Sequence, residues 1–177
     1  VGALYYYTNF LSAFLLFFTI AFYLFVYTIW LKRKTPQNIV IGGIAGSLPP
    51  VIGWSISTNS ISLVSISLFL IIFFWTPSHF WALSLYKARD YKKAKIPMLP
   101  IIAGTKKTKF NILIYAILMF PVAIAPYFLN LASSLYLAVS LISSTFYVYL
   151  CYKLFKENNS RTSNIIARKI FVYSIFY

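Results

Sequence analysis

The fold class follows from residues 10–34, which read FLSAFLLFFTIAFYLFVYTIWLKRK. The apolar run 10–31 contains no charged residue and is closed by the basic residues 32–34. An α-helix rises about 1.5 Å per residue, so about 20 apolar residues cross the hydrocarbon core of a bilayer. Residues 10–31 therefore predict a membrane-spanning helix with a cluster of positive charge at its end.

The composition of the whole chain also indicates a membrane protein. Of its 177 residues, 60% are hydrophobic and only 10% are charged, which is typical of a chain surrounded by lipid. The net charge of +14 raises the alternative of nucleic-acid binding, but the basic residues are clustered between apolar runs and are not mixed with acids over a surface. We expect an all-α, multi-pass transmembrane helical bundle that does not bind nucleic acid. The single cysteine, Cys151, excludes an intrachain disulfide.

Further apolar runs predict the remaining helices. The expected membrane helices are 10–31, 37–55, 61–85, 110–129 and 135–155, with partial helices at 1–7 and 165–177. The sequence begins without methionine and ends within an apolar run. We therefore expect one transmembrane domain over residues 1–177, truncated at both ends.

The basic residues predict the orientation of the bundle. They lie in the segments 32–34, 87–109 and 153–169, whereas the turns near 9, 58 and 131 carry none. These segments fall in every second connection, so the positive-inside rule places all of them on the cytoplasmic or matrix face. We expect a bacterial inner (plasma) membrane, with the mitochondrial inner membrane as the alternative.

Glycine and proline residues mark the helix predicted at 37–55. Gly42 and Gly46 are four residues apart, so a neighbouring helix or a flat ligand could approach the backbone closely; packing is the favoured reading. Pro49 and Pro50 remove backbone donors and should bend the helix. A bend at this depth usually borders a cavity or a partner helix, but it identifies no ligand.

The chain has few groups that can perform acid, base or metal chemistry. His79 is its only histidine, and Asp90 is one of two carboxylates, the other being Glu157. If one helix continues from 75 to 93, His79 and Asp90 share a face and lie about 16 Å apart. This separation is too large for a catalytic dyad and suggests two ligand levels, one inside the membrane and one at its surface.

Each of these two residues has a functional and a structural interpretation. A histidine within a membrane helix is costly unless it faces a cavity or a protein interior, which favours function; a hydrogen bond between helices is the alternative. Asp90 could be an ordinary surface carboxylate paired with lysine. The cations around it are Lys87, Arg89, Lys92, Lys93 and Lys95. This surplus suits a polyanion such as diphosphate, although topology or anionic lipid would also explain it. The long connection after residue 85 predicts a lid or binding segment.

At these residues the chain resembles the protohaem IX farnesyltransferase (haem O synthase) family, within the UbiA-type intramembrane prenyltransferase superfamily. The matching blocks are 27–46, 49–54, 75–83, 90–91, 97–100 and 167–171. The resemblance implies a bundle of nine helices with a cytoplasm-facing active site, of which this chain covers the end of the third helix to the start of the ninth. It also implies transfer of the farnesyl group of farnesyl diphosphate, with addition of water, to a vinyl group of haem B, giving haem O and diphosphate.

The resemblance also assigns roles to individual residues. Asp90 and His79 are the implied catalytic residues. Asp90 would hold Mg²⁺, while Lys87, Arg89 and Lys93 would receive the diphosphate. His79 would ligate the iron of haem B or position the haem. The partners expected on this basis are farnesyl diphosphate, haem B, the lipid bilayer and haem A synthase.

The sequence departs from the family pattern at three places. The first Asp-rich motif of the superfamily is absent, so we expect this chain by itself to be inactive. Asp90 has no second aspartate four residues away, because those positions are Tyr86 and Ala94; this favours haem over a quinone-type acceptor. Ser78 replaces a usual second proline. The alternatives are a prenyltransferase acting on a quinone precursor and a non-catalytic haem-binding or transport remnant.

Overall fold

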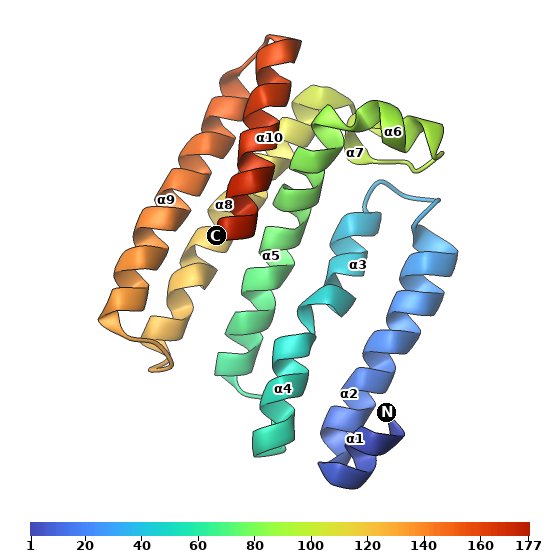
Figure 1. Ribbon diagram of the computed structural model, residues 1–177, viewed down its shortest axis with the longest axis vertical. Coiled ribbons are helices and arrows are strands. Elements are labelled where there is room, and N and C mark those ends of the chain that lie inside the picture. The colour runs from blue at the N-terminus through green and yellow to red at the C-terminus, as the bar shows by residue number, and fades with distance from the viewer.

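The computed structural model describes all residues, 1–177, and contains helices and connections but no strand (Figure 1). The elements are α1 Gly2–Tyr7, α2 Phe10–Ala21, η1 Phe22–Leu31, α3 Asn38–Ser47, α4 Pro49–Thr58, α5 Leu63–Tyr86, α6 Ala88–Lys93, α7 Leu99–Ile102, α8 Gly104–Phe128, α9 Ser134–Lys156 and α10 Ser160–Phe176. The predicted all-α class is confirmed.

Five helical segments are long and apolar enough to cross a membrane. They are Phe10–Leu31, Asn38–Thr58, Leu63–Tyr86, Gly104–Phe128 and Ser134–Lys156. Large apolar side chains, among them Phe25, Leu135 and Ile142, are exposed on these helices, as expected of side chains that contact lipid. The chain is therefore a multi-pass membrane protein.

The first span changes its winding along its length. α2 begins at Asn9, whose side chain accepts a hydrogen bond from the Ser12 backbone N–H (2.8 Å). The continuation η1 is a π-helix, in which Lys32 N–H donates to the Tyr27 carbonyl five residues earlier (2.8 Å). The wider turns of a π-helix shift the faces of the following residues and often occur at functional sites. The sequence pattern, which is apolar throughout, carries no signal for this change.

The second span is interrupted where the two prolines stand. α3 ends at Ser47 and α4 begins at Pro49, which occupies the first helical turn. Proline is tolerated there because the first N–H groups of a helix have no intrahelical acceptor. The expected disturbance by Pro49 and Pro50 thus takes the form of two consecutive helices, α3 and α4, separated by Leu48.

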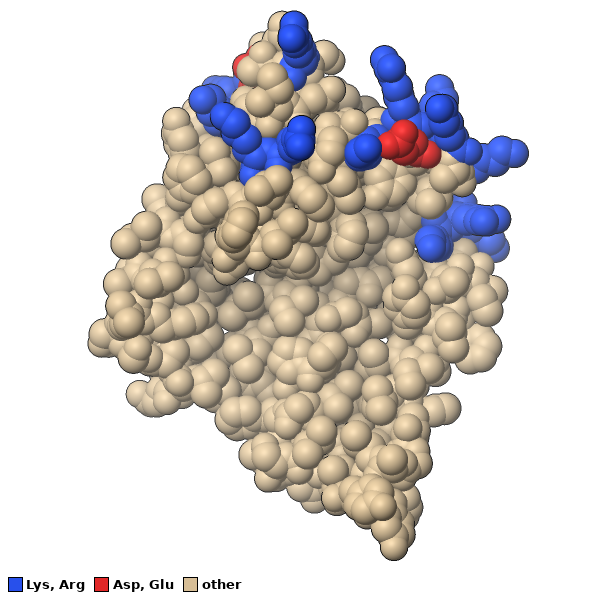
Figure 2. All heavy atoms as spheres, in the orientation of Figure 1, with Lys and Arg blue, Asp and Glu red and all other residues tan.

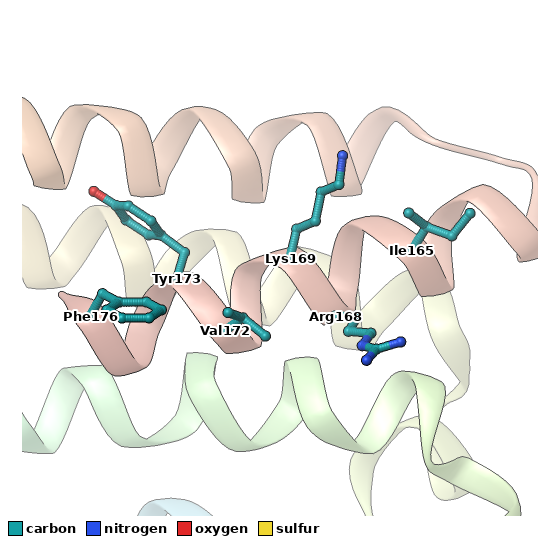
Figure 3. Close-up of a pocket in the computed structure, with 6 residues that line it drawn as sticks. All are labelled: Ile165, Arg168, Lys169, Val172, Tyr173 and Phe176. Carbon is teal, nitrogen blue, oxygen red and sulfur yellow. The ribbon is translucent and has the colours of Figure 1, made fainter.

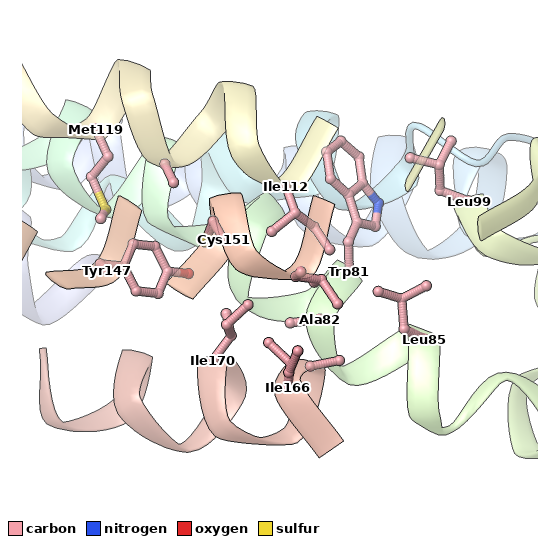
Figure 4. Close-up of a cluster of buried hydrophobic side chains, with 13 residues drawn as sticks. Trp81, Ala82, Leu85, Leu99, Ile112, Met119, Tyr147, Cys151, Ile166 and Ile170 are labelled. Atoms are coloured by element: carbon pink, nitrogen blue, oxygen red, sulfur yellow. The ribbon is translucent and has the colours of Figure 1, made fainter. Parts of the chain in front are cut away.

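Helix α5 occupies the centre of the bundle, between α3 and α4 on one side and α8 to α10 on the other (Figure 1). The main apolar core lies where α5, α8, α9 and α10 meet, and it includes the fully or nearly fully buried Trp81, Ile112, Cys151 and Ile170 (Figure 4). Burial of Cys151 agrees with its reading as a small apolar residue. The core holds α10 against the half of α5 that carries His79.

α5 ends at Tyr86, close to the predicted end at residue 85, so the condition that one helix continues from 75 to 93 is not met. Lys87 has φ −103° and ψ 17° and separates α5 from the short helix α6. The 16 Å spacing of an unbroken helix therefore does not apply. The connection is also not an open loop: it contains α6 and α7 and is anchored by the buried Met98 and Leu99. α8 begins at Gly104, earlier than the predicted residue 110.

Positive charge gathers at one end of the molecule. Figure 2 shows the lysines and arginines at the end where α6, α7 and the η1–α3 and α9–α10 connections lie, whereas the body and the other end are free of them in this view. A bundle with apolar sides and one basic end has the charge asymmetry of a protein oriented in a membrane.

Candidate functional site

His79 lies on α5 between two aromatic side chains. Its ring stacks on Trp75 (centroids 4.2 Å apart, planes 19° apart) and on Phe171 of α10 (4.6 Å, 28°). Phe80 approaches edge-on at 5.0 Å. The histidine is 7% exposed. These contacts fix the plane of the His79 ring. A fixed ring plane agrees with both interpretations of His79, as a ligand to a bound group and as a structural residue.

A hydrogen bond between His79 and Ser174 of α10 orients this ring. His79 Nδ1 lies 2.6 Å from Ser174 Oγ, and the Ser174 hydroxyl donates its only proton to the Phe171 carbonyl (2.7 Å). With the Ser174 hydroxyl donating to Phe171, the tautomer that satisfies both contacts has its proton on His79 Nδ1 and donates it to Ser174 Oγ. In the neutral ring Nε2 then keeps its lone pair, which can accept a proton or bind a metal. The contact is a hydrogen bond between helices, and it also leaves one nitrogen free for a ligand.

Asp90 stands on α6 at the basic end of the molecule. Its carboxylate lies 3.3 Å from Lys87 Nζ, and the two side chains are 65% and 54% exposed, respectively. An ion pair of this exposure contributes at most about 1 kcal/mol to stability. The pair therefore contributes little to the fold, and the carboxylate remains accessible to a ligand.

A cavity of about 580 Å³ surrounds Asp90. Its lining residues are Tyr86, Lys87, Arg89, Asp90 and Arg168. The structure thus brings together three of the four predicted residues of the diphosphate and metal site, whereas Lys93 lies outside the lining. Arg168 was missed by sequence reasoning because it comes from α10, and no periodicity relates it to residue 90. The only feature of the sequence that could have indicated Arg168 is that it lies in the stretch 167–171, which matches the family.

The polar groups of this cavity carry a positive balance. Lys87, Arg89 and Arg168 supply positive charge to the lining, and Asp90 is its only acidic residue. No group of three or more histidine, cysteine or acidic side chains could hold a metal on its own. Asp90 can supply one carboxylate, which suits Mg²⁺ because this ion usually takes one or two carboxylates together with phosphate oxygens and water.

A second cavity, of about 290 Å³, lies between η1, α3 and α5. Its lining includes Tyr23, Tyr27, Gly43, Gly46 and Trp75. The glycines of α3 form one of its walls. A side chain at the adjacent Gly42 would collide with the Tyr27 ring, so that glycine serves packing, as the sequence reading favoured. The apolar lining suits a hydrocarbon or a flat aromatic group.

Helix α10 connects the level of His79 with the level of Asp90. Ser174 contacts His79, and Arg168 lines the cavity at Asp90. Between them, Phe171 packs on His79 and on Tyr86, and the Phe171 and Tyr86 ring centroids are 6.1 Å apart. These α10 residues are three apart and therefore lie on one side of the helix. The two levels predicted from the sequence are thus joined by one face of α10.

The bundle thus combines a cation-lined cavity at one end with stacked aromatic side chains around His79. The UbiA prenyltransferase family model matches residues 1–175, and the chain belongs to this family. The resemblance noted in the sequence is thereby confirmed.

Several curated relatives carry the name protoheme IX farnesyltransferase. The protein from Pelagibacter ubique is 60% identical over 177 residues, which are 100% of this chain and 58% of the relative. Those from Orientia tsutsugamushi and Parvibaculum lavamentivorans are 54% and 47% identical over 96% of this chain and 53% of their own lengths. The chain thus spans somewhat more than half of the relatives' length. No solved structure matches it.

Proposed function

We propose that this chain forms part of an enzyme that transfers the farnesyl group of farnesyl diphosphate to a vinyl group of haem B, giving haem O and diphosphate. The observation that carries the proposal is the 60% identity, along the whole chain, to a protein named protoheme IX farnesyltransferase. The cation-lined cavity is of the kind that a diphosphate would need, and His79 offers a nitrogen donor of the kind that ligates a haem iron.

The proposed reaction needs different surroundings at the basic end, where the diphosphate would lie, and deeper in the bundle, near His79. The allylic C–O bond breaks, and both of its electrons go to the departing diphosphate. The farnesyl carbon then bonds to the haem vinyl group, water adds to the resulting cation, and one proton is released. Cations must stabilise the growing charge of the diphosphate, whereas an aromatic, dry environment protects the farnesyl cation.

We assign the diphosphate to the cavity at the basic end. Lys87 and Arg89 would donate hydrogen bonds to phosphate oxygens, and Asp90 would hold Mg²⁺, which would neutralise further charge on the leaving group. Lys93 is exposed on the same short helix but outside the cavity lining. In this assignment it attracts the anion over a longer range.

We assign haem B to the level of His79. The Nδ1 hydrogen bond to Ser174 keeps the Nε2 lone pair available, as required of a residue that ligates the haem iron. Trp75 and Phe171 hold the ring between them and limit its rotation. His79 would in this way position haem B below the diphosphate.

The orientation and partners belong to the same proposal. The basic end would face the cytoplasm, in the inner membrane of a bacterium, which agrees with the charge asymmetry and with the bacterial sources of the relatives. Haem A synthase would be a partner, because a farnesylated haem partitions into the membrane and passes most readily to a neighbouring membrane enzyme.

The test is a cellular one. The complete gene would be expressed in a bacterial host that makes haem B but lacks haem O, and the extracted haems would be weighed by mass spectrometry. We expect haem O to appear with the complete protein. Membranes that contain the protein but only haem B would contradict the proposal.

A further inference from the structure

Arg168 is the one cation of the cavity at Asp90 that comes from a different part of the chain. Lys87, Arg89 and Asp90 belong to the end of α5 and to α6, whereas Arg168 lies near the middle of α10. A site that takes cations from separate helices can contact more than one side of a small anion. The contribution of α10 therefore bears on which ligand the cavity can hold.

The charge of Arg168 has no counter-ion in the structure. The Lys87–Asp90 contact is the single ion pair, and the sequence contains only two acidic residues. Arg89 and Arg168 are thus left without a carboxylate partner while they line the same cavity. Uncompensated cations held around a cavity favour a polyanion over a neutral ligand.

The backbone that carries Arg168 is firmly held. Ala167, directly before it, and Ile170, two residues after it, are fully buried in the main core. Phe171 packs edge-on against Tyr86, a lining residue of the same cavity. The base of the arginine side chain therefore stays close to the cavity, so less entropy is lost when the guanidinium binds a ligand.

The next residue, Lys169, has the same charge but a different direction. Figure 3 shows Arg168 directed towards α5, whereas Lys169 extends towards the opposite side of α10. Lys169 does not line the cavity at Asp90. Two neighbouring cations on one helix thus differ in whether they can reach the cavity, which makes Lys169 a matched control.

We propose that Arg168 binds the diphosphate of the allylic substrate and stabilises it as the leaving group. This inference rests on the proposed farnesyl transfer. As the C–O bond breaks, both bonding electrons pass to the diphosphate, and the guanidinium donates two parallel N–H hydrogen bonds to its oxygens. Arginine stays protonated throughout, so it stabilises charge and transfers no proton. Helix α10 would in this way serve both ligand levels, through Arg168 above and Ser174 below.

The experiment uses the complete protein in detergent, with the variants Arg168→Gln, Arg168→Lys and Lys169→Gln. Initial rates are measured against farnesyl diphosphate at saturating haem B, and binding of inorganic diphosphate and of haem B is measured separately. We expect Arg168→Gln to lower kcat/KM for farnesyl diphosphate by roughly 10²-fold, the usual effect of losing one such donor. It should weaken diphosphate binding and leave haem binding unchanged. Arg168→Lys should have a smaller effect than Arg168→Gln on both quantities, because the positive charge is kept. Lys169→Gln should have the kcat/KM and the diphosphate affinity of the unaltered protein.

The outcomes separate this inference from the function on which it rests. If the unaltered protein makes haem O and Arg168→Gln behaves like Lys169→Gln, the role of Arg168 is refuted and the function stands. A loss of haem binding equal to the loss of diphosphate binding would also refute it, because that pattern indicates a structural role. If the unaltered protein makes no haem O, the proposed function fails, and the diphosphate-binding measurement still decides whether Arg168 belongs to an anion site.

Discussion

At the scale of residues, His79 and Asp90 are held in very different ways. His79 is enclosed by Trp75, Phe171 and Ser174, whereas Asp90 has one exposed ion pair with Lys87. The surroundings of His79 therefore restrict its motion before any ligand arrives. The surroundings of Asp90 leave its carboxylate open to a ligand. This openness is expected of a carboxylate that binds a metal ion together with the phosphate oxygens of a substrate.

Asp90→Asn in the complete protein should abolish farnesyl transfer while haem binding persists. The amide keeps the size of the side chain but removes the negative charge that Mg²⁺ requires. Stability should change by less than about 1 kcal/mol, because the ion pair with Lys87 is exposed. Turnover is measured by haem mass spectrometry and haem binding by absorption titration. Normal turnover in this variant would remove Asp90 from the site.

Ser174→Ala should weaken haem binding without removing His79 itself. The substitution deletes the acceptor of the Nδ1 proton, and loss of such a supporting hydrogen bond typically lowers metal affinity by about 10- to 100-fold. Ser84→Ala is the matched control, because Ser84 of α5 is buried like Ser174 but its hydroxyl bonds only to its own helix. The haem spectrum and haem affinity of Ser174→Ala and His79→Gln are compared with those of Ser84→Ala. If neither variant differs from this control, His79 is not a haem ligand.

Ser78 shows how a departure from the family pattern is accommodated. The resemblance leads us to expect a second proline here, next to Pro77. In the structure the Ser78 hydroxyl lies 2.9 Å from the Tyr147 hydroxyl of α9 and 3.0 Å from the Trp75 carbonyl. A proline could make neither hydrogen bond. Serine thus adds a buried polar link between α5 and α9 at this position.

At the scale of elements, glycine sets the approach of η1 to α3. A Cβ atom at Gly42 would overlap the Tyr27 ring, whereas one at Gly46 would meet no atom within 4 Å. These glycines are one helical repeat apart, so the sequence pattern alone treats them as equivalent. The structure separates them, because only Gly42 is in contact with the neighbouring helix.

Gly42→Ala should destabilise the η1–α3 contact, whereas Gly46→Ala should be neutral or slightly stabilising. In the first variant the Tyr27 ring must move, and overpacking of this kind typically costs about 1–3 kcal/mol. In the second, alanine has the better helix propensity and meets open space. Thermal unfolding in detergent compares the two. Equal melting temperatures would contradict the described packing.

Lys109 ties the start of α8 to the α9–α10 connection. Its Nζ atom donates to the Glu157 carbonyl and to Ser163 Oγ, both at 2.7 Å, and the side chain is buried. Sequence reasoning counted this lysine among the loop cations, because charge alone does not distinguish a structural lysine from one that meets solvent.

Lys109→Met should destabilise the packing of α10. The substitution leaves two partners without their donor, and each unsatisfied buried group costs about 1–3 kcal/mol. The exposed Lys106 provides the control variant Lys106→Met. Limited proteolysis at the α9–α10 connection should accelerate in the first variant only. Equal cleavage rates would show that the buried lysine does not hold this end of the bundle.

At the scale of the molecule, the fold class could be predicted from the sequence, whereas the breaks within individual helices could not. Apolar runs and loop charges report on lipid contact, so the all-α, multi-pass class could be inferred from them. The break at Lys87 and the π-helix η1 have no signal in the apolar pattern, and the pairing of His79 with Ser174 joins residues 95 positions apart. Arg168 joins the cavity for the same reason, since only the docking of α10 places it near Asp90.

The most direct test of the proposed farnesyl transfer uses the purified complete protein with farnesyl diphosphate, haem B and Mg²⁺. Haem O would be measured by mass spectrometry, and released diphosphate would be measured in the same sample. We predict one diphosphate for each haem O formed, and neither product with Asp90→Asn. Haem B recovered unchanged alongside a farnesylated quinone precursor, when both acceptors are offered, would contradict the haem assignment.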